Sequence, residues 1–119
     1  MADWIVFNFA IPLADNFTKI SHQIEKFNDW EIKTAKLFGG LSKIGDSLMG
    51  LWCDDDLNSE ENLIEDYNHW YKVAIRPEDI EKLKKYLAKT ALIFGQKYIY
   101  LERAGIAEYI NALSNESGT

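Results

Sequence analysis

The stretch RPEDIEKLKKYLAKTALIFG, Arg76–Gly95, decides the fold, because it carries the signals of an amphipathic helix that covers a sheet. Pro77 suits the first helical turn, where its missing N–H would lack a partner in any case. Negative charge follows at the positive end of the helix dipole, from Glu78, Asp79 and Glu81. An apolar stripe recurs at three- and four-residue steps and comprises Ile80, Leu83, Leu87, Ala91 and Phe94. The lysines fall off that stripe (Lys82, Lys84, Lys85 and Lys89), and Gly95 offers a left-handed end to the helix.

Three segments around this helix have the character of strands: Trp4–Leu13, Tyr67–Ile75 and Lys97–Glu102. In the first, one face is predicted to hold Ile5, Phe7, Phe9 and Ile11, and the other Trp4, Val6, Asn8 and Ala10. In the second, the two faces are Tyr67, His69, Tyr71, Val73 and Ile75 against Asn68, Trp70, Lys72 and Ala74. Both faces of Trp4–Leu13 are largely apolar, which indicates an inner strand.

The remaining elements are predicted from weaker patterns. Apolar spacing favours a helix over Phe17–Phe27, capped by Asp15 or Asn16. Glu31–Leu41 is expected to be a strand that bends at Gly39 and Gly40. Leu48–Cys53 is expected to be a short strand that pairs back. Ile106–Leu113 could continue the sheet, but its period favours a short C-terminal helix.

This order predicts an α+β protein of the ferredoxin-like class, an antiparallel sheet with two helices packed on one face. Residues 1–113 are expected to form a single domain, and residues 114–119 a flexible C-terminal tail. The other sheet face remains open for a ligand or a partner, and a homodimer could cover it.

Composition narrows the class of partner. The chain has 119 residues, a formal net charge of −6 and a pI near 4.8, which argues against a direct nucleic-acid binder and fits a basic protein partner. The single cysteine, Cys53, fits a reducing compartment, so cytoplasmic residence is expected. No apolar run approaches the ~18 residues that span a bilayer, so no membrane partner is predicted. The residues call for no cofactor.

The acidic segment DDDLNSEENLIED, Asp54–Asp66, partly resembles the calcium loop of an EF-hand. Counted from Asp54, oxygen ligands fall at positions one, three, five and twelve, namely Asp54, Asp56, Asn58 and Glu65. Ser59 stands where the loop needs glycine, and the preceding LMGLWC does not have the pattern of a helix. A solvated acidic loop is therefore favoured over a metal site.

The main functional hypothesis is a protein–protein interaction module. Seven carboxylates lie close in sequence to aromatic side chains, and aromatic residues anchor many interfaces. The predicted partner-binding set is Trp52, Asp54, Asp55, Asp56, Glu60, Glu61, Glu65, Asp66 and Trp70. Such a surface is typical of small acidic immunity or inhibitor proteins that neutralise a basic partner, such as a nuclease. No catalytic set is recognisable around Cys53 and His69, so the hypothesis includes no enzymatic activity.

The alternative comes from a different class of protein. It is a small-molecule-binding or enzymatic domain, dimeric and ferredoxin-like, with a pocket on the open sheet face around Tyr71, His69 and Tyr98.

Overall fold

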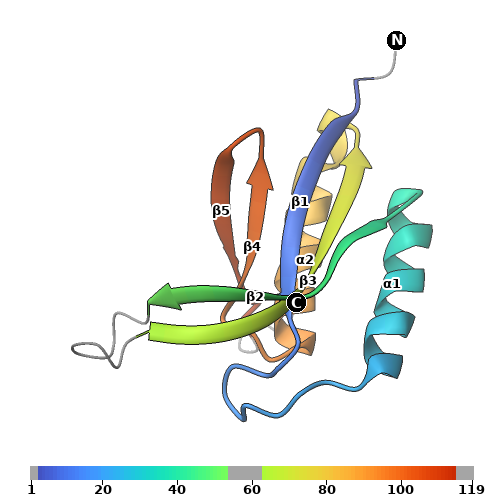
Figure 1. Ribbon diagram of the computed structural model, residues 1–119. Coiled ribbons are helices and arrows are strands. Elements are labelled where there is room, and N and C mark those ends of the chain that lie inside the picture. Colours follow the sequence, from blue (N-terminus) through green and yellow to red (C-terminus); the bar gives the residue numbers. More distant parts are fainter. Residues whose placement is uncertain (1–2, 54–62, 115–119) are drawn as a thin grey trace.

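The computed structural model describes residues 3–53 and 63–114. Within these ranges one antiparallel sheet of five strands has the order β2-β3-β1-β4-β5 (Figure 1). The strands are β1 (Ile5–Pro12), β2 (Ser42–Cys53), β3 (Leu63–Ile75), β4 (Tyr98–Arg103) and β5 (Ile106–Asn111). The helices are α1 (Ile24–Phe38) and α2 (Ile80–Ile93), and a 3₁₀ turn, η2 (Pro77–Asp79), leads into α2. The predicted α+β, ferredoxin-like arrangement is confirmed.

Both helices cover one face of the sheet, as predicted, and the apolar stripe of α2 makes the contact. Leu83, Leu87, Ala91 and Phe94 are each 0% exposed. The α1 residues Phe27 and Trp30 join them over Phe9, whose ring stacks on that of Tyr71 at 5.6 Å. Burial of this aromatic layer drives the helices onto the sheet.

The first helix lies later in the chain than its apolar spacing predicts. Phe17 and Ile20 are exposed (68% each), and residues 13–23 form a loop instead of a helix. Asp15 does cap a turn, because its Oδ1 accepts hydrogen bonds from the N–H groups of Phe17 (2.7 Å) and Thr18 (3.0 Å). These short-range bonds stabilise a turn that ends before any helix propagates.

The predicted strand over Glu31–Leu41 is also wrong, since most of it belongs to α1. Thr34 favours strands in isolation, but here its hydroxyl donates to the Trp30 carbonyl at 2.6 Å inside the helix. The helix ends at Gly39, whose φ of 83° is the left-handed end that glycine permits. Burial of Phe27, Trp30 and Thr34 on one helical face overrides the local preference.

The predicted C-terminal helix is a strand, β5. Ala104 and Gly105 have φ values of 50° and 82°, the two positive values of a type I′ hairpin turn. This turn places Ile106–Asn111 in antiparallel register with Arg103–Tyr98. The helical spacing of Ile106 and Tyr109 therefore has no structural counterpart.

The hairpin of β2 and β3 extends beyond the sheet. β3 pairs with β1 only as far as Asn68↔Pro12, while β2 and β3 remain paired down to Cys53↔Leu63. Register shifts between Lys43, Gly45 and Leu48 bend β2, as bulges do. Figure 1 shows the last part of β2 and the first part of β3 turned across the lower part of the sheet. In the described part of the chain, no helix is long and apolar enough to cross a membrane.

Candidate functional site

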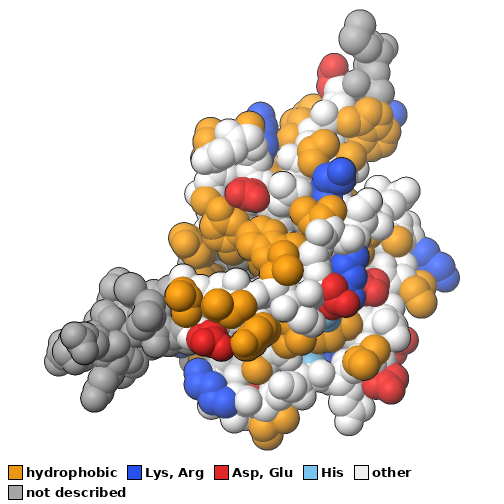
Figure 2. Space-filling model, in the orientation of Figure 1, with side chains coloured by type: hydrophobic (Ala, Val, Ile, Leu, Met, Phe, Trp, Pro, Cys, Tyr) orange, Lys and Arg blue, Asp and Glu red, His pale blue; other side chains and the backbone are white. Residues whose placement is uncertain are grey.

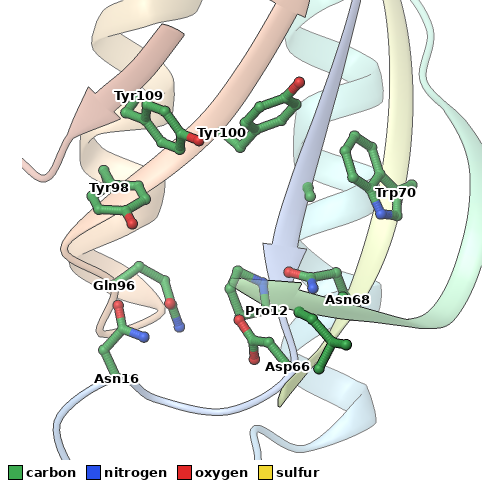
Figure 3. Close-up of a pocket in the computed structure, with 12 residues that line it drawn as sticks. Pro12, Asn16, Asp66, Asn68, Trp70, Gln96, Tyr98, Tyr100 and Tyr109 are labelled. Carbon is green, nitrogen blue, oxygen red and sulfur yellow. The ribbon is translucent and has the colours of Figure 1, made fainter. Parts of the chain in front are cut away.

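The open sheet face contains a hollow of about 320 Å³, within the roughly 300–1,000 Å³ range of small-molecule sites. Its floor is Ala10 and Pro12 of β1, and its walls come from β3, β4, β5 and the extended hairpin (Figure 3). Figure 2 shows hydrophobic side chains gathered on this face, with the charged ones mostly around them. The hollow is thus a mainly apolar site on the face that the helices leave uncovered.

Strand register explains why the surface is hollow at this position. One cross-strand row places Ala10 between Trp70 of β3 and Tyr100 of β4, with Tyr109 of β5 beyond. Cross-strand neighbours project on the same face of a sheet. The small methyl group of Ala10 therefore lies between large rings, which leaves space above it.

The aromatic walls hold one another in place. The rings of Trp70 and Tyr100 meet edge to face with centroids 5.6 Å apart, and those of Tyr98 and Tyr109 do so at 4.9 Å. Tyr100 and Tyr109 are 5.6 Å apart, so the three tyrosines form one continuous group. Edge-to-face packing of this kind favours fixed ring orientations, which leaves ring surfaces turned toward the hollow.

The lower rim of the hollow is polar and is anchored by its own backbone contacts. Asn16 Oδ1 accepts a hydrogen bond from the Lys97 N–H at 2.9 Å, which leaves the Asn16 amide N–H₂ to face the rim. Gln96 is the reverse case, because its Nε2 donates to the carbonyls of Ala14 (2.7 Å) and Phe94 (2.9 Å). Its Oε1 is then the group free to accept a hydrogen bond. Figure 3 shows these two amide groups side by side. The rim thus offers an adjacent donor and acceptor.

The extended hairpin supplies the remaining side of the hollow. Gly50, Leu51 and Asp66 line it from this arm, and Asn68 lies where the arm leaves the sheet. Asp66 is the only carboxylate among the described lining residues. A negative charge at the rim of an apolar hollow attracts a cationic ligand.

Tyr100 is held as a neutral phenol. Burial raises its pKa, and the hydrogen bond from its hydroxyl to Glu102 Oε2 (3.1 Å) raises it further. Tyr100 therefore acts as a hydrogen-bond donor and not as a base at neutral pH.

The predicted partner-binding residues do not form one surface in the described structure. Trp70 and Asp66 both line the hollow. Glu65 points elsewhere, since its Oε1 accepts a hydrogen bond from the Tyr67 hydroxyl at 2.8 Å. Trp52 pairs through its backbone with Ile64. Asp54, Asp55, Asp56, Glu60 and Glu61 lie outside the described residues, as do the calcium-loop positions Asp54, Asp56 and Asn58. Within residues 3–53 and 63–114 no group of three or more His, Cys, Asp or Glu side chains could hold a metal ion.

The alternative hypothesis predicted a pocket on the open sheet face, where the hollow lies, but two of the three residues it named are not on that face. Tyr98 lines the hollow, but Tyr71 and His69 lie on the helix-covered face, 0% and 8% exposed. Alternation along β3 turns these two toward α1 and turns Trp70 outward. The residues missed were Ala10, Tyr100, Tyr109, Asn16 and Gln96. Alternation of Tyr98 and Tyr100 against Ile99 and Leu101 could have identified Tyr100, whereas Tyr109 was hidden by the helical interpretation of its segment.

Comparison with known proteins gives one informative result. No family model matches the chain, and no curated protein matches it in sequence. A solved structure of a phage SAM lyase in complex with S-methyl-5′-thioadenosine is similar, with a TM-score of 0.64 and 15% identity over 94% of this chain and 92% of that one. At this identity the similarity shows a shared fold.

This neighbour contradicts the main functional hypothesis. A non-enzymatic immunity or inhibitor protein is the wrong interpretation, because the structural similarity is to an enzyme that holds a small molecule. The open-face hollow agrees with that correction. The alternative, a small-molecule-binding or enzymatic domain, is the better-supported interpretation.

Proposed function

We propose that this protein binds S-adenosylmethionine (SAM) in the open-face hollow and cleaves it to S-methyl-5′-thioadenosine. The observation that carries the proposal is the pairing of aromatic walls with a rim that offers one amide donor and one amide acceptor. The shared fold with a SAM lyase supports the same ligand class.

The rim fits an adenine edge. Adenine presents a donor, the N6 amino group, next to ring-nitrogen acceptors, and asparagine or glutamine amides recognise that pattern with paired hydrogen bonds. Here the two complementary groups come from different side chains, Gln96 Oε1 as the acceptor and Asn16 Nδ2 as the donor. The nearby Tyr98 ring provides a face on which the base stacks.

The walls fit the sulfonium centre. A cation near the face of a Trp or Tyr ring is attracted by the ring quadrupole, by about 0.5–2 kcal/mol depending on its desolvation. Trp70 and Tyr100 supply such rings, and Asp66 adds a negative charge at the rim. A ligand that combines adenosine with a positive sulfur therefore matches both parts of the hollow.

The proposed reaction breaks the bond between the sulfonium sulfur and the γ carbon of the methionine chain. The electron pair passes to sulfur, which becomes the neutral thioether of S-methyl-5′-thioadenosine. The γ carbon forms its new bond by one of two routes. Either the substrate's own carboxylate oxygen attacks it and closes a lactone, or a β proton is lost and a double bond forms between the β and γ carbons. In the second route the β proton passes to water or to a basic group at the site. The sulfonium charge disappears in both routes, so attraction to the rings weakens once the product has formed.

Cytoplasmic residence remains part of the proposal. The single Cys53 supports it, because a chain with one cysteine can form no disulfide within itself and fits a reducing compartment.

The test is calorimetric titration of the protein with S-methyl-5′-thioadenosine and with SAM, combined with chromatographic detection of S-methyl-5′-thioadenosine formed from SAM. Ala10→Leu fills the hollow, because Ala10 is 6% exposed at its floor. We expect this variant to lose binding of both compounds and to form no product. Ala74→Leu makes the same change at an exposed position of the open face outside the hollow, and we expect it to behave as the wild type. Failure of the wild type to bind either compound would contradict the proposal.

A further inference from the structure

A polar row crosses the open face next to the hollow. Asn8 of β1 lies between Lys72 of β3 and Glu102 of β4 in register. Their core-facing neighbours are buried (Phe7, Phe9, Tyr71, Val73 and Leu101), so alternation turns all three polar side chains to the open face. Asn8 is two residues from Ala10, about 6.6 Å along the strand, so the row borders the hollow directly.

The row holds opposite charges that do not neutralise one another. Lys72 and Glu102 are two strand spacings apart, about 10 Å between Cα atoms. Among the described residues Lys72 makes no hydrogen bond or ion pair, and Glu102 accepts one hydrogen bond, from Tyr100 to Oε2. A separated cation and anion on one face match a ligand that carries both charges.

Asn8 adds an unused acceptor between the two charges. Its Oδ1 is buried without a hydrogen-bond partner within the described structure. Buried polar atoms are nearly always paired, because an unpaired one loses its hydration without compensation. An incoming N–H donor at this position would relieve that cost.

We infer that this row is a subsite for a zwitterionic amino-acid group, the α-ammonium and α-carboxylate of the methionyl end of SAM. This inference rests on the proposed function, since it takes the adenosine to lie in the hollow. Lys72 pairs with the carboxylate, and the ammonium donates to Glu102 and Asn8 Oδ1; an ammonium has three such donors to share. The sulfonium centre then lies between the hollow and the row, beside the Trp70–Tyr100 pair.

Three ligands separate the contributions. S-methyl-5′-thioadenosine has neither an amino-acid group nor a charged sulfur, S-adenosylhomocysteine has only the amino-acid group, and SAM has both. The comparison of the first two therefore isolates the polar row, and neither of these compounds contains the sulfonium bond that the proposed reaction breaks.

The experiment measures Kd for S-methyl-5′-thioadenosine and S-adenosylhomocysteine in the wild type, Lys72→Met and Glu102→Gln. We expect each substitution to weaken S-adenosylhomocysteine binding by about 10- to 100-fold, the range for charge-assisted hydrogen bonds, and to leave S-methyl-5′-thioadenosine binding unchanged. Lys33→Met and Glu81→Gln remove exposed charges from the helices and serve as matched controls.

The outcomes separate this inference from the function on which it rests. If the wild type binds both compounds equally, or if the variants weaken both equally, the subsite is wrong and the hollow remains an adenosine site. If the wild type binds neither compound, the proposed function and the subsite both fail.

Discussion

The indole of Trp70 meets the ring of Tyr100 edge to face at 5.6 Å and 73°, and in register these two residues flank Ala10. This contact joins the two strands that flank β1 and marks the boundary between two parts of the open face. The apolar hollow lies on one side of it, and the polar row of Lys72, Asn8 and Glu102 on the other. A ligand with a heterocycle at one end and charges at the other would span the hollow and the polar row together.

Trp70 should therefore contribute directly to binding. We expect Trp70→Ala to weaken binding of S-methyl-5′-thioadenosine roughly 5- to 150-fold, which corresponds to the loss of about 1–3 kcal/mol of stacking. Trp70→Phe keeps an aromatic face and should lose less. Trp4→Ala is the control, because that ring is 52% exposed and packs under Arg76. Equal Kd values for Trp70→Ala and the wild type, by calorimetry, would remove Trp70 from the site.

Gly95 should be required for the lower rim. Its φ is 62°, and a β carbon there would lie 1.8 Å from Asp15 Oδ2. Gly95→Ala must therefore move Asp15 and with it the loop that carries Asn16. We expect a loss of at least about 2 kcal/mol in the free energy of unfolding, from left-handed strain plus the clash.

Gly39→Ala separates the two causes. Gly39 has a φ of 83°, but nothing lies within 4 Å of the added carbon. The free energy of unfolding of this control, measured with urea, should fall only by the cost of the left-handed strain, about 1 kcal/mol. We also expect ligand affinity to fall in Gly95→Ala and not in Gly39→Ala. Equal losses of stability in the two variants would show that the clash with Asp15 is unimportant.

The sequence predicted the parts of the fold that depend on long, regular patterns. The stripe from Leu83 to Phe94 and the alternation of β1 and β3 each extend over several residues and are buried as a set. Three segments were misassigned, namely Phe17–Phe27, Glu31–Leu41 and Ile106–Leu113. Thr34 is buried in a helix despite its strand preference, and the turn at Ala104–Gly105 commits the following residues to pair with β4.

The site was predicted less well than the fold, for a physical reason. Alternation in β3 correctly separates Trp70 from Tyr71, but the sequence does not say which of the two faces the helices cover. The hollow also depends on Ala10 lying between Trp70 and Tyr100, which is a matter of register between strands far apart in the chain. The Asn16–Gln96 pair depends on a loop contact with the end of α2 and has no local signature.

The raised pKa of the Tyr71 phenol should make the free energy of unfolding fall at alkaline pH. Its pKa is raised, first by burial and then by the hydrogen bond from its hydroxyl to Glu31 Oε2 at 2.6 Å. Below the ordinary pKa of about 10 both the folded and unfolded chains keep the proton, so this stabilisation is fully present. Above pH 10 the unfolded chain releases the proton and the folded chain retains it, so the free energy of unfolding falls by up to about 1.4 kcal/mol per pH unit for this group.

Urea unfolding between pH 8 and 11 tests this expectation. Tyr71→Phe should lower stability at pH 8 by roughly 1–3 kcal/mol, because it removes a hydrogen bond to a carboxylate. Above pH 10 the free energy of unfolding of Tyr71→Phe should also fall less steeply with pH than that of the wild type, because the variant lacks the one proton that this phenol releases on unfolding. Tyr109→Phe is the control, since that ring is 60% exposed. Parallel pH profiles for Tyr71→Phe and the wild type would contradict the assignment.

Asn8 should be a residue whose replacement stabilises the protein and weakens its ligand binding. The unpaired Oδ1 costs free energy in the unliganded fold, roughly 1–3 kcal/mol for a buried acceptor without a donor. Asn8→Leu keeps the branched shape at Cγ and removes that acceptor, so we expect Tm to rise by a few degrees or more. The same variant should weaken S-adenosylhomocysteine binding and leave S-methyl-5′-thioadenosine binding unchanged. Asn111→Leu, at an exposed position of β5, should change neither property. A lower Tm for Asn8→Leu, measured by thermal unfolding, would mean that Asn8 serves the fold and not the ligand.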